Sequence, residues 1–199
     1  MRRILVTGAN GQLGNAMRLL GATSRNEYRF TDVAELDITD EEAVRRAVCD
    51  GRIDVIVNCA AYTNVDRAEE DEATADRIKR LAVGNLARAA AAADATLIHV
   101  STDYVFSGDA NRPYDETCET HPLGVYGRTK LAGEAEVEQS GCKSLIIRTA
   151  WLYSEFGHNF LKTMLRLTAE RDRLTVVFDQ AENRLHAQKA VMYLLMGEQ

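Results

Sequence analysis

The sequence predicts an α/β fold in which a doubly wound parallel sheet carries helices on both faces. Short β-rich runs alternate with longer helical stretches along the 199 residues, which is the pattern of such sheets. The runs 54–58 and 145–147 have continuous apolar centres, as expected for strands buried on both faces. A glycine-rich segment directly follows the first apolar run, where a parallel sheet of this kind binds its ligands.

The expected elements follow from the same patterns. Asp40 or Thr39, with Glu41 and Glu42 behind it, predicts the start of a helix, and Gly51 predicts its end. The alanine-rich stretch 82–95 has the highest helix propensity of the chain and predicts a tightly packed helix. We expect strands at 3–7, 28–31, 55–58, 97–101, 144–148 and 174–178, and helices near 12–20, 40–49, 67–93, 126–139 and 158–171.

Composition excludes several classes of protein. The net charge of −6 and the pI of about 5.3 leave no basic excess for nucleic acid or an anionic membrane. Four widely spaced cysteines suit neither a zinc site nor a disulfide framework, so we expect reduced thiols and a cytoplasmic location. The first apolar run is too short for a signal peptide. The acidic run 69–72 is interpreted as a solvated helix face, and no metal site is predicted.

Three glycines form the first candidate site. Gly8, Gly11 and Gly14 lie at the end of the first expected strand and open a helix, as in the dinucleotide-binding turn of the Rossmann fold. A glycine turn without a ligand is the alternative, which the position at the first crossover disfavours. Asp32, near the end of the second strand, favours NADH through the ribose hydroxyls, whereas Arg25 and Arg29 would favour the 2′-phosphate of NADPH. The choice between the two cofactors stays open.

Tyr126 and Lys130 form the second candidate site. They are four residues apart in an expected helix and therefore share one face. The pair follows the fourth strand, whose end carries Thr102, so all three side chains are expected at the carboxyl edge of the sheet. Reduction of a ketone needs a proton and hydrogen-bond donors at its oxygen. We expect Lys130 to lower the pKa of the tyrosine and Thr102 to hold the carbonyl oxygen. A solvent-facing pair is the alternative.

Taken together, these motifs resemble a known family. Residues 36–40, 57–66, 101–106, 126–130 and 148–151, with the glycine turn, are similar to the dTDP-4-dehydrorhamnose reductases, which belong to the extended short-chain dehydrogenases/reductases. The resemblance covers residues 1 to about 180. It implies reduction of the 4-keto group of dTDP-4-dehydro-L-rhamnose by NADPH or NADH in dTDP-L-rhamnose biosynthesis, with the dTDP-sugar as binding partner. A homodimer is possible for a member of this family.

The resemblance also assigns roles to individual residues. It implies a catalytic set of Thr102, Tyr126 and Lys130, and contacts to the sugar from Thr102, Asp103 and Trp151. For Trp151, a core residue at the end of the fifth strand is the alternative. The residues implied in cofactor binding are Gly8, Gly11, Gln12, Leu13, Gly14, Asp32, Asp37, Ile38, Ala61, Tyr62, Thr63, Val100, Tyr126 and Lys130.

The sequence departs from the family pattern in two places. Lys79 stands where the family usually has an asparagine that helps hold a water path behind the catalytic lysine. A second cation there would weaken that relay, unless Lys79 points to solvent. After Gln180 the sequence ceases to resemble the family, so we expect a Rossmann domain over 1–180 and a divergent tail over 181–199 that can form one short helix. The substrate domain is then largely missing, through an interrupted gene or a diverged, shortened homologue.

Two functions follow from this interpretation. The first is the reductase, whose activity we expect to be impaired by the loss of the lid that covers the substrate. The second is a non-catalytic NAD(P)-binding protein with a regulatory or interaction role. A related epimerase or dehydratase is a third reading, and the runs 101–106 and 59–63 argue against it.

Overall fold

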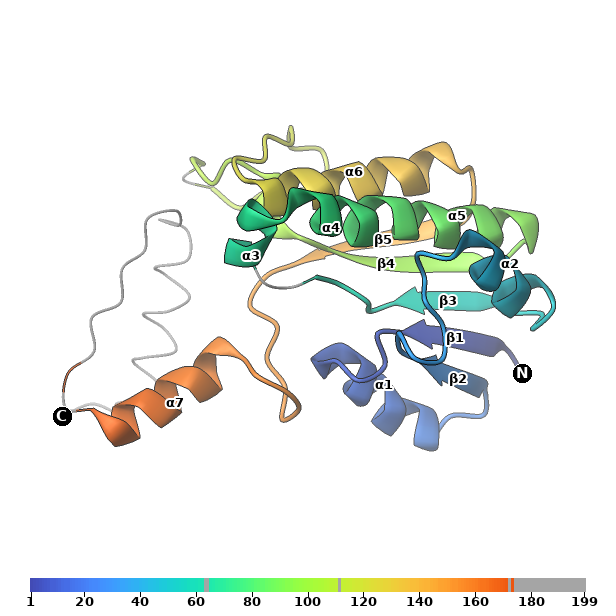
Figure 1. Cartoon of the computed structure of the whole chain (residues 1–199), viewed down its shortest axis with the longest axis horizontal. Coiled ribbons are helices and arrows are strands. Elements are labelled where there is room, and N and C mark those ends of the chain that lie inside the picture. Colours follow the sequence, from blue (N-terminus) through green and yellow to red (C-terminus); the bar gives the residue numbers. More distant parts are fainter. Residues whose placement is uncertain (63–64, 111, 172, 174–199) are drawn as a thin grey trace.

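The computed structural model contains a five-stranded, wholly parallel sheet (Figure 1). It describes residues 1–62, 65–110, 112–171 and 173. The strand order is β2-β1-β3-β4-β5, so the chain reverses direction across the sheet between β1 and β3. The strands are β1 (Arg3–Thr7), β2 (Glu27–Thr31), β3 (Val55–Asn58), β4 (Thr96–Thr102) and β5 (Lys143–Thr149). They confirm five predicted strands to within one residue, and the sixth, at 174–178, lies outside the described residues.

Helices cover both faces of the sheet, as predicted (Figure 1). Leu5, Ile56 and Leu97 point to one face and form the main core with α2 (Glu41–Cys49) and α5 (Ala82–Ala92). Val6 and Val57 point to the other face, where Met17 of α1 (Gln12–Ala22) packs against them. Both faces of the central strands are therefore buried. Asp40 caps α2 by accepting the Ala43 N–H, which confirms the predicted helix start.

The edge strand β5 corrects one prediction. Leu145 and Ile147 are 54% and 43% exposed, although the run 145–147 was expected to be buried on both faces. Ile146 between them packs against the main core. The alternating strand geometry sends Leu145 and Ile147 to the opposite face, where α1 covers β1 and β2 but does not reach β5 in the described part of the chain.

The long helix predicted at 67–93 is divided into four pieces. They are α3 (Val65–Glu70), α4 (Glu72–Asp76), a π-helical turn η1 (Arg77–Leu81) and α5. Asp71 causes the first break, because its carboxylate accepts the Thr74 N–H at 3.0 Å and so starts a new helix. The alanine-rich part remains one helix with eight buried residues, as predicted. The acidic run 69–72 is exposed, as expected for a solvated face.

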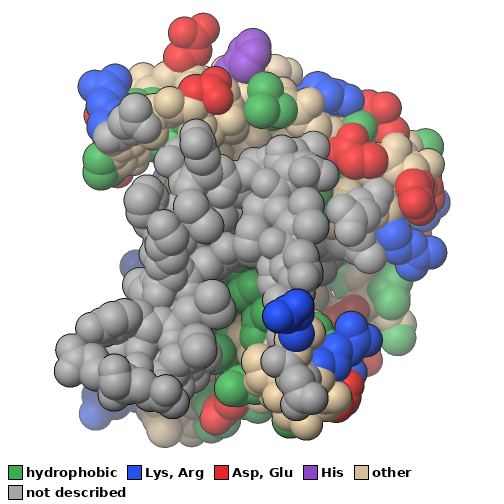
Figure 2. Space-filling view, turned by 90° about the vertical axis from the view of Figure 1, so that its left-hand side faces the viewer, with side chains coloured by type: hydrophobic (Ala, Val, Ile, Leu, Met, Phe, Trp, Pro, Cys, Tyr) green, Lys and Arg blue, Asp and Glu red, His purple; other side chains and the backbone are tan. Residues whose placement is uncertain are grey.

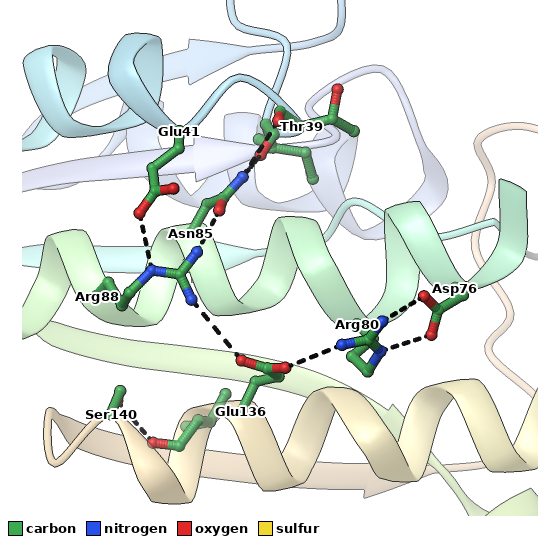
Figure 3. A network of polar contacts seen from close by, with 10 residues as sticks. Thr39, Glu41, Asp76, Arg80, Asn85, Arg88, Glu136 and Ser140 are labelled. Atoms are coloured by element: carbon green, nitrogen blue, oxygen red, sulfur yellow. Dashed lines mark hydrogen bonds and ion pairs between the residues drawn. The ribbon is translucent and has the colours of Figure 1, made fainter. Parts of the chain in front are cut away.

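Polar contacts join α5 to its neighbours (Figure 3). Arg88 donates to Glu41 of α2 at 2.9 Å and lies 3.7 Å from Glu136 of α6 (Val125–Gln139). The buried amide of Asn85 donates to the carbonyl oxygen of Ile38 at 3.0 Å. This last bond ties the loop after β2 to the core, so the segment around Asp37 is held beside the carboxyl edge of the sheet.

The distribution of charged side chains on the surface agrees with the absence of a basic excess in the composition. Lysine and arginine side chains alternate with aspartate and glutamate around the described part of the face in Figure 2, rather than gathering by sign. None of the described helices is long and apolar enough to cross a membrane. All four cysteines lie in the described part and are free thiols.

Candidate active site

The three glycines differ in what surrounds them. Gly8 has a positive φ of 62°, and a Cβ there would lie 2.6 Å from the Cα of Ala60. A Cβ on Gly14 would lie 2.5 Å from the Cα of Ala9, so helix α1 can approach the turn only without a side chain. A Cβ on Gly11 would meet only the carbonyl oxygen of Gly8, at 3.3 Å. Gly8 and Gly14 therefore allow the packing, and Gly11 leaves the mouth of the turn open.

The amino end of α1 faces the space above this turn. Gly11 is its N-cap and provides no side-chain acceptor, so the first N–H groups of an 11-residue helix have no side-chain cap. Asp32 accepts the Asn10 N–H at 2.9 Å and thereby orders the turn. The positive end of the helix dipole and these N–H groups suit an anion.

Arg18 is a cation at this turn that the sequence analysis missed. Its guanidinium lies 4.7 Å from the centre of the Phe30 ring and donates to the side-chain oxygen of Asn10 at 3.4 Å. Arg25 and Arg29, the two cations considered for a 2′-phosphate, are exposed and, like Arg18, do not line the cavity described next. Arg18 lies one turn along α1 from Gly14, and this spacing was the feature of the sequence that could have identified it.

One cavity of about 770 Å³ joins the two predicted sites. Its volume lies within the range of small-molecule and cofactor sites. Tyr62 does not line it, and that side chain packs against a small apolar cluster of Ala68, Ala75 and Val125. Gly14 is buried behind the turn, and Thr63 lies outside the described residues. The predicted residues that line the cavity are Gly8, Gly11, Gln12, Leu13, Asp32, Asp37, Ile38, Ala61, Val100, Thr102, Asp103, Tyr126, Lys130 and Trp151.

Helix α6 presents Tyr126 and Lys130 to this cavity from one face, as predicted. The Lys130 ammonium donates to the carbonyl oxygen of Val100 on β4 at 2.6 Å. Burial lowers the pKa of Lys130 to about 8. Burial and the nearby Asp103 carboxylate raise the pKa of Tyr126, so the expectation that this pKa is lowered was wrong. Desolvation of the phenolate outweighs the neighbouring ammonium, and Tyr126 keeps its proton at neutral pH.

Thr102 ends β4 at the same place. Its hydroxyl donates to the Asp103 carboxylate at 3.0 Å and accepts the Tyr104 N–H at 3.2 Å. These bonds cap the short 3-10 turn η2 (Asp103–Val105) and fix the hydroxyl at the cavity wall. Tyr104 also packs edge-on against Tyr126, with ring centres 5.2 Å apart.

Lys79 does not point to solvent. Of the two alternatives, a second cation near the site and a solvent-facing side chain, the second is therefore wrong. The side chain lies on η1 with 2% of the residue exposed. Its Nζ lies 3.7 Å from the centre of the Tyr126 ring and 5.6 Å from that of Tyr62. Among the described residues the Nζ has no hydrogen-bond partner. Lys79 does not line the cavity, so it contacts Tyr126 from within the protein.

Two buried polar groups that were not predicted support the site, Glu134 from behind it and Asn58 in the cavity wall. Glu134, on the same face of α6 as Lys130, accepts from Ser101 and from the guanidinium of Arg148 at 2.6 Å. Asn58 accepts the Thr7 hydroxyl at 2.7 Å and contacts His99 at 3.1 Å. Burial lowers the pKa of His99 to about 3, so its ring is neutral. The spacing of Tyr126, Lys130 and Glu134 at four-residue intervals was the available signal for Glu134.

The far end of the cavity is formed by the segment after β5. Trp151 has a φ of +55°, which is uncommon for a large side chain, and its ring packs edge-on against Phe160 at 5.1 Å. It is half-buried and lines the cavity, rather than closing the core. Asn159, the N-cap of α7 (Phe160–Glu170), donates to the side-chain oxygen of Gln12 at 3.1 Å. The glycine turn and the segment of Trp151 are therefore directly connected.

Comparison with known proteins decides the family. A model of the RmlD substrate binding domain family matches residues 1–196. The chain belongs to this family. Among the RmlD relatives, the dTDP-4-dehydrorhamnose reductase of Mycolicibacterium smegmatis is 45% identical over 181 residues, which is 90% of this chain and 55% of that protein. That of Escherichia coli is 44% identical over 181 residues, 89% of this chain and 60% of that protein. The chain thus spans little more than half the length of these relatives.

Solved structures of RmlD-type proteins share the fold. A dTDP-4-dehydrorhamnose reductase of Clostridium acetobutylicum is 41% identical, with a TM-score of 0.86 over 97% of this chain and 70% of that one. The enzyme of Bacillus anthracis, whose structure is a complex with NADP, is also 41% identical, with a TM-score of 0.80 over 85% of this chain and 60% of that one.

Proposed function

We propose that this chain is the cofactor-binding and catalytic part of a dTDP-4-dehydrorhamnose reductase, which reduces the 4-keto group of dTDP-4-dehydro-L-rhamnose with NADPH or NADH. One observation carries the proposal: a single cavity is lined at one end by Gly8 and Gly11 and at the other by Thr102, Tyr126 and Lys130. The relatives of the RmlD family carry this activity in their names. A biosynthetic reductase of this kind is expected in the cytoplasm.

The residues present fit a dinucleotide. The turn at Gly8 and Gly14 has no room for a side chain, whereas Gly11 is open toward the cavity, as a pyrophosphate in contact with backbone would require. Gln12 and Leu13, at the first turn of α1, would present their N–H groups to that pyrophosphate. Asp32 would meet the adenosine ribose, Asp37 and Ile38 the adenine, and Ala61 with Val100 the path toward the nicotinamide.

The chemistry then divides among three side chains. Bound NAD(P)H supplies the hydride that adds to the carbonyl carbon. Tyr126 donates its phenolic proton to the carbonyl oxygen, where negative charge develops. Its raised pKa keeps that proton in place until the charge appears. Thr102 positions the oxygen by donating its hydroxyl proton, which has to turn from Asp103 to the substrate, and Lys130, fixed by Val100, supplies positive charge near the phenolate. Asp103 and Trp151 would contact the sugar.

Two measurements on this chain test the proposal. We expect NADPH to bind with stoichiometry near one, and dTDP-4-dehydrorhamnose to be reduced in its presence. Tyr126→Phe removes the proton donor but retains the ring, so turnover should fall by a factor on the order of 10² while NADPH still binds. Equal turnover in wild type and Tyr126→Phe would refute the role of Tyr126. Binding without any turnover would instead favour the non-catalytic NAD(P)-binding function.

A further inference from the structure

A buried lysine lies against the face of the tyrosine that lines the cavity. The Nζ of Lys79 is 3.7 Å from the centre of the Tyr126 ring, and the residue is only 2% exposed. A buried ammonium normally has a carboxylate or a hydrogen-bond acceptor. Among the described residues Lys79 has neither, and the ring faces of Tyr126 and Tyr62 are the groups that it contacts. Such a position costs stability.

The π-helical turn holds Lys79 in this position. η1 adds a wide turn between α4 and α5, and the whole segment packs against α6. Arg80, the next residue, points away and pairs with Asp76 at 2.6 Å, so only Lys79 is directed into the protein. A π-turn inside a longer helix is typical of functional sites.

The charges around Lys79 do not neutralise it. Burial and the nearby Lys130 lower the pKa of Lys79 to about 8, and only Glu69 acts in the opposite direction. Glu69 is exposed, and its carboxylate lies 3.4 Å from the backbone N–H of Tyr126. The buried or half-buried titratable groups on the packed elements are Tyr126 and Lys130, Glu134 paired with Arg148, Glu136 paired with Arg80 and Arg88, Asp76 paired with Arg80, and Tyr62. The same elements also carry Glu72, Arg77, Arg128 and Glu138, which are exposed.

We propose that Lys79 is a positioning residue for the proton transfer: its ammonium group holds the Tyr126 ring from behind and favours release of the phenolic proton toward the cavity. This inference rests on the proposed reductase function. The proton passes from the Tyr126 oxygen to the substrate carbonyl oxygen as the hydride adds to carbon, and the ring is left with a negative charge. A cation against the ring face attracts that charge more strongly than it attracts the neutral ring. Lys79 and Lys130 then stabilise the phenolate together.

The first test needs no turnover. Tyrosine labelled with ¹³C at Cζ is introduced into the protein, and the Tyr126 signal is assigned from its loss in Tyr126→Phe. In the wild type we expect this signal to shift near pH 8, where the adjacent ammonium groups lose their protons. The shift should become smaller in Lys79→Met, which has a similar shape without charge, and in Lys79→Arg, whose charge persists above pH 8. An unchanged shift in both variants would overturn the proposal.

The second test uses the rate of a single turnover with NADPH. Lys79→Met should slow reduction on the order of tenfold below pH 8, the effect of losing one close cation. Lys79→Arg should retain most of the rate and keep it to higher pH. Lys143→Met, an exposed lysine paired with Asp94, is the matched control and should not change it. A Lys79→Met rate and pH profile equal to the wild type would overturn the proposal. No turnover in any form, wild type included, would contradict the reductase function, and the labelled tyrosine would then decide the role of Lys79.

Lys79→Met is also expected to fold. Replacing a buried charge that lacks a partner by an apolar group of similar size is neutral or stabilising. Thermal unfolding of both Lys79 variants therefore accompanies each measurement. A slower rate in a variant that is at least as stable as the wild type separates the proposed role from a loss of structure.

Discussion

The ammonium group of Lys130 and the carbonyl oxygen of Val100 are 2.6 Å apart, so the lysine that lines the cavity is tied to the inner strand β4. The bond crosses from α6 to the sheet and fixes where the charge lies. It leaves two further protons on the ammonium group for a ligand or for the phenolate of Tyr126. Burial lowers the pKa of this lysine and of Lys79 to about 8, so the site carries two cations only below that pH.

Stability should therefore rise between pH 8 and 9.5. Both lysines have a pKa near 8 in the folded chain and an ordinary value of 10.5 when unfolded. Between these values the unfolded chain binds more protons, so raising the pH favours the folded state. Each lysine should contribute on the order of 1 kcal/mol over this interval. Urea unfolding at several pH values measures the slope, which should be smaller in Lys79→Met and unchanged in Lys143→Met. A flat or falling profile in the wild type would contradict the buried charges.

The glycine turn offers a matched pair of substitutions. Gly14→Ala places a methyl group 2.5 Å from the backbone of Ala9, so we expect a loss of about 1–3 kcal/mol in the free energy of unfolding. Gly11→Ala meets only one atom at 3.3 Å and should fold nearly normally. It should nevertheless weaken NADPH binding at least tenfold, because its methyl group faces the cavity. Normal NADPH binding by Gly11→Ala would show that the dinucleotide lies elsewhere.

The pair of Glu134 and Arg148 should respond unequally to removal of either partner. Arg148→Met leaves the Glu134 carboxylate, 2% exposed, without its ion pair, and should cost roughly 3 kcal/mol. Glu134→Gln should cost less, because the Arg148 side chain is 26% exposed and can be hydrated. Chemical unfolding of the two single variants and the double variant measures the coupling. Arg166→Met on α7 breaks an exposed pair and should cost no more than about 0.5 kcal/mol. Equal, small effects at all three positions would show that the buried pair is not important for stability.

Asp32 should influence the choice between the two cofactors. Its carboxylate lies at the end of β2 and lines the cavity. Asp32→Ala removes a hydrogen-bond acceptor for the ribose hydroxyls and a charge that repels a 2′-phosphate. We expect affinity for NADH to fall more than affinity for NADPH, so that their ratio moves on the order of tenfold toward NADPH. The variant also loses the bond to the Asn10 N–H, which lowers both affinities, and for this reason the ratio is the measured quantity. An unchanged ratio would place Asp32 away from the ribose.

Arg18 provides the complementary measurement. It is the cation that lies beside the glycine turn, and it donates to Asn10. If the 2′-phosphate of NADPH lies near this turn, Arg18→Met should weaken NADPH binding more than NADH binding, since a phosphate gains more from a guanidinium than a hydroxyl does. Both arginines are exposed and neither lines the cavity, but Arg18 is hydrogen-bonded to the turn and, among the described residues, Arg29 is not, so Arg29→Met is the control. A larger effect from Arg29 than from Arg18 would reverse this assignment.

The local elements were predictable because their signals are local. Apolar runs gave β1 and β3 at their observed ends, and Asp40 marked the first residue before α2. The glycine turn and the pair of Tyr126 and Lys130 were found because their spacing follows backbone geometry over a few residues. The break at Asp71 was not predicted because the residues on both sides of it have strong helix propensity, which favours one continuous helix. In the structure the hydrogen bond from the Thr74 N–H to the Asp71 carboxylate starts a new helix instead.

The sequence by itself determined the order of strands and helices along the chain, the resemblance to the family, and most of the predicted residues that line the cavity. Only the tertiary structure decided the electrostatics of the site. Periodicity cannot show that Lys79 is buried against Tyr126, that Glu134 meets Arg148, or that the pKa of Tyr126 is raised. These properties depend on desolvation and on charges contributed by segments distant in the chain, and both exist only when α6, η1 and the sheet are packed together.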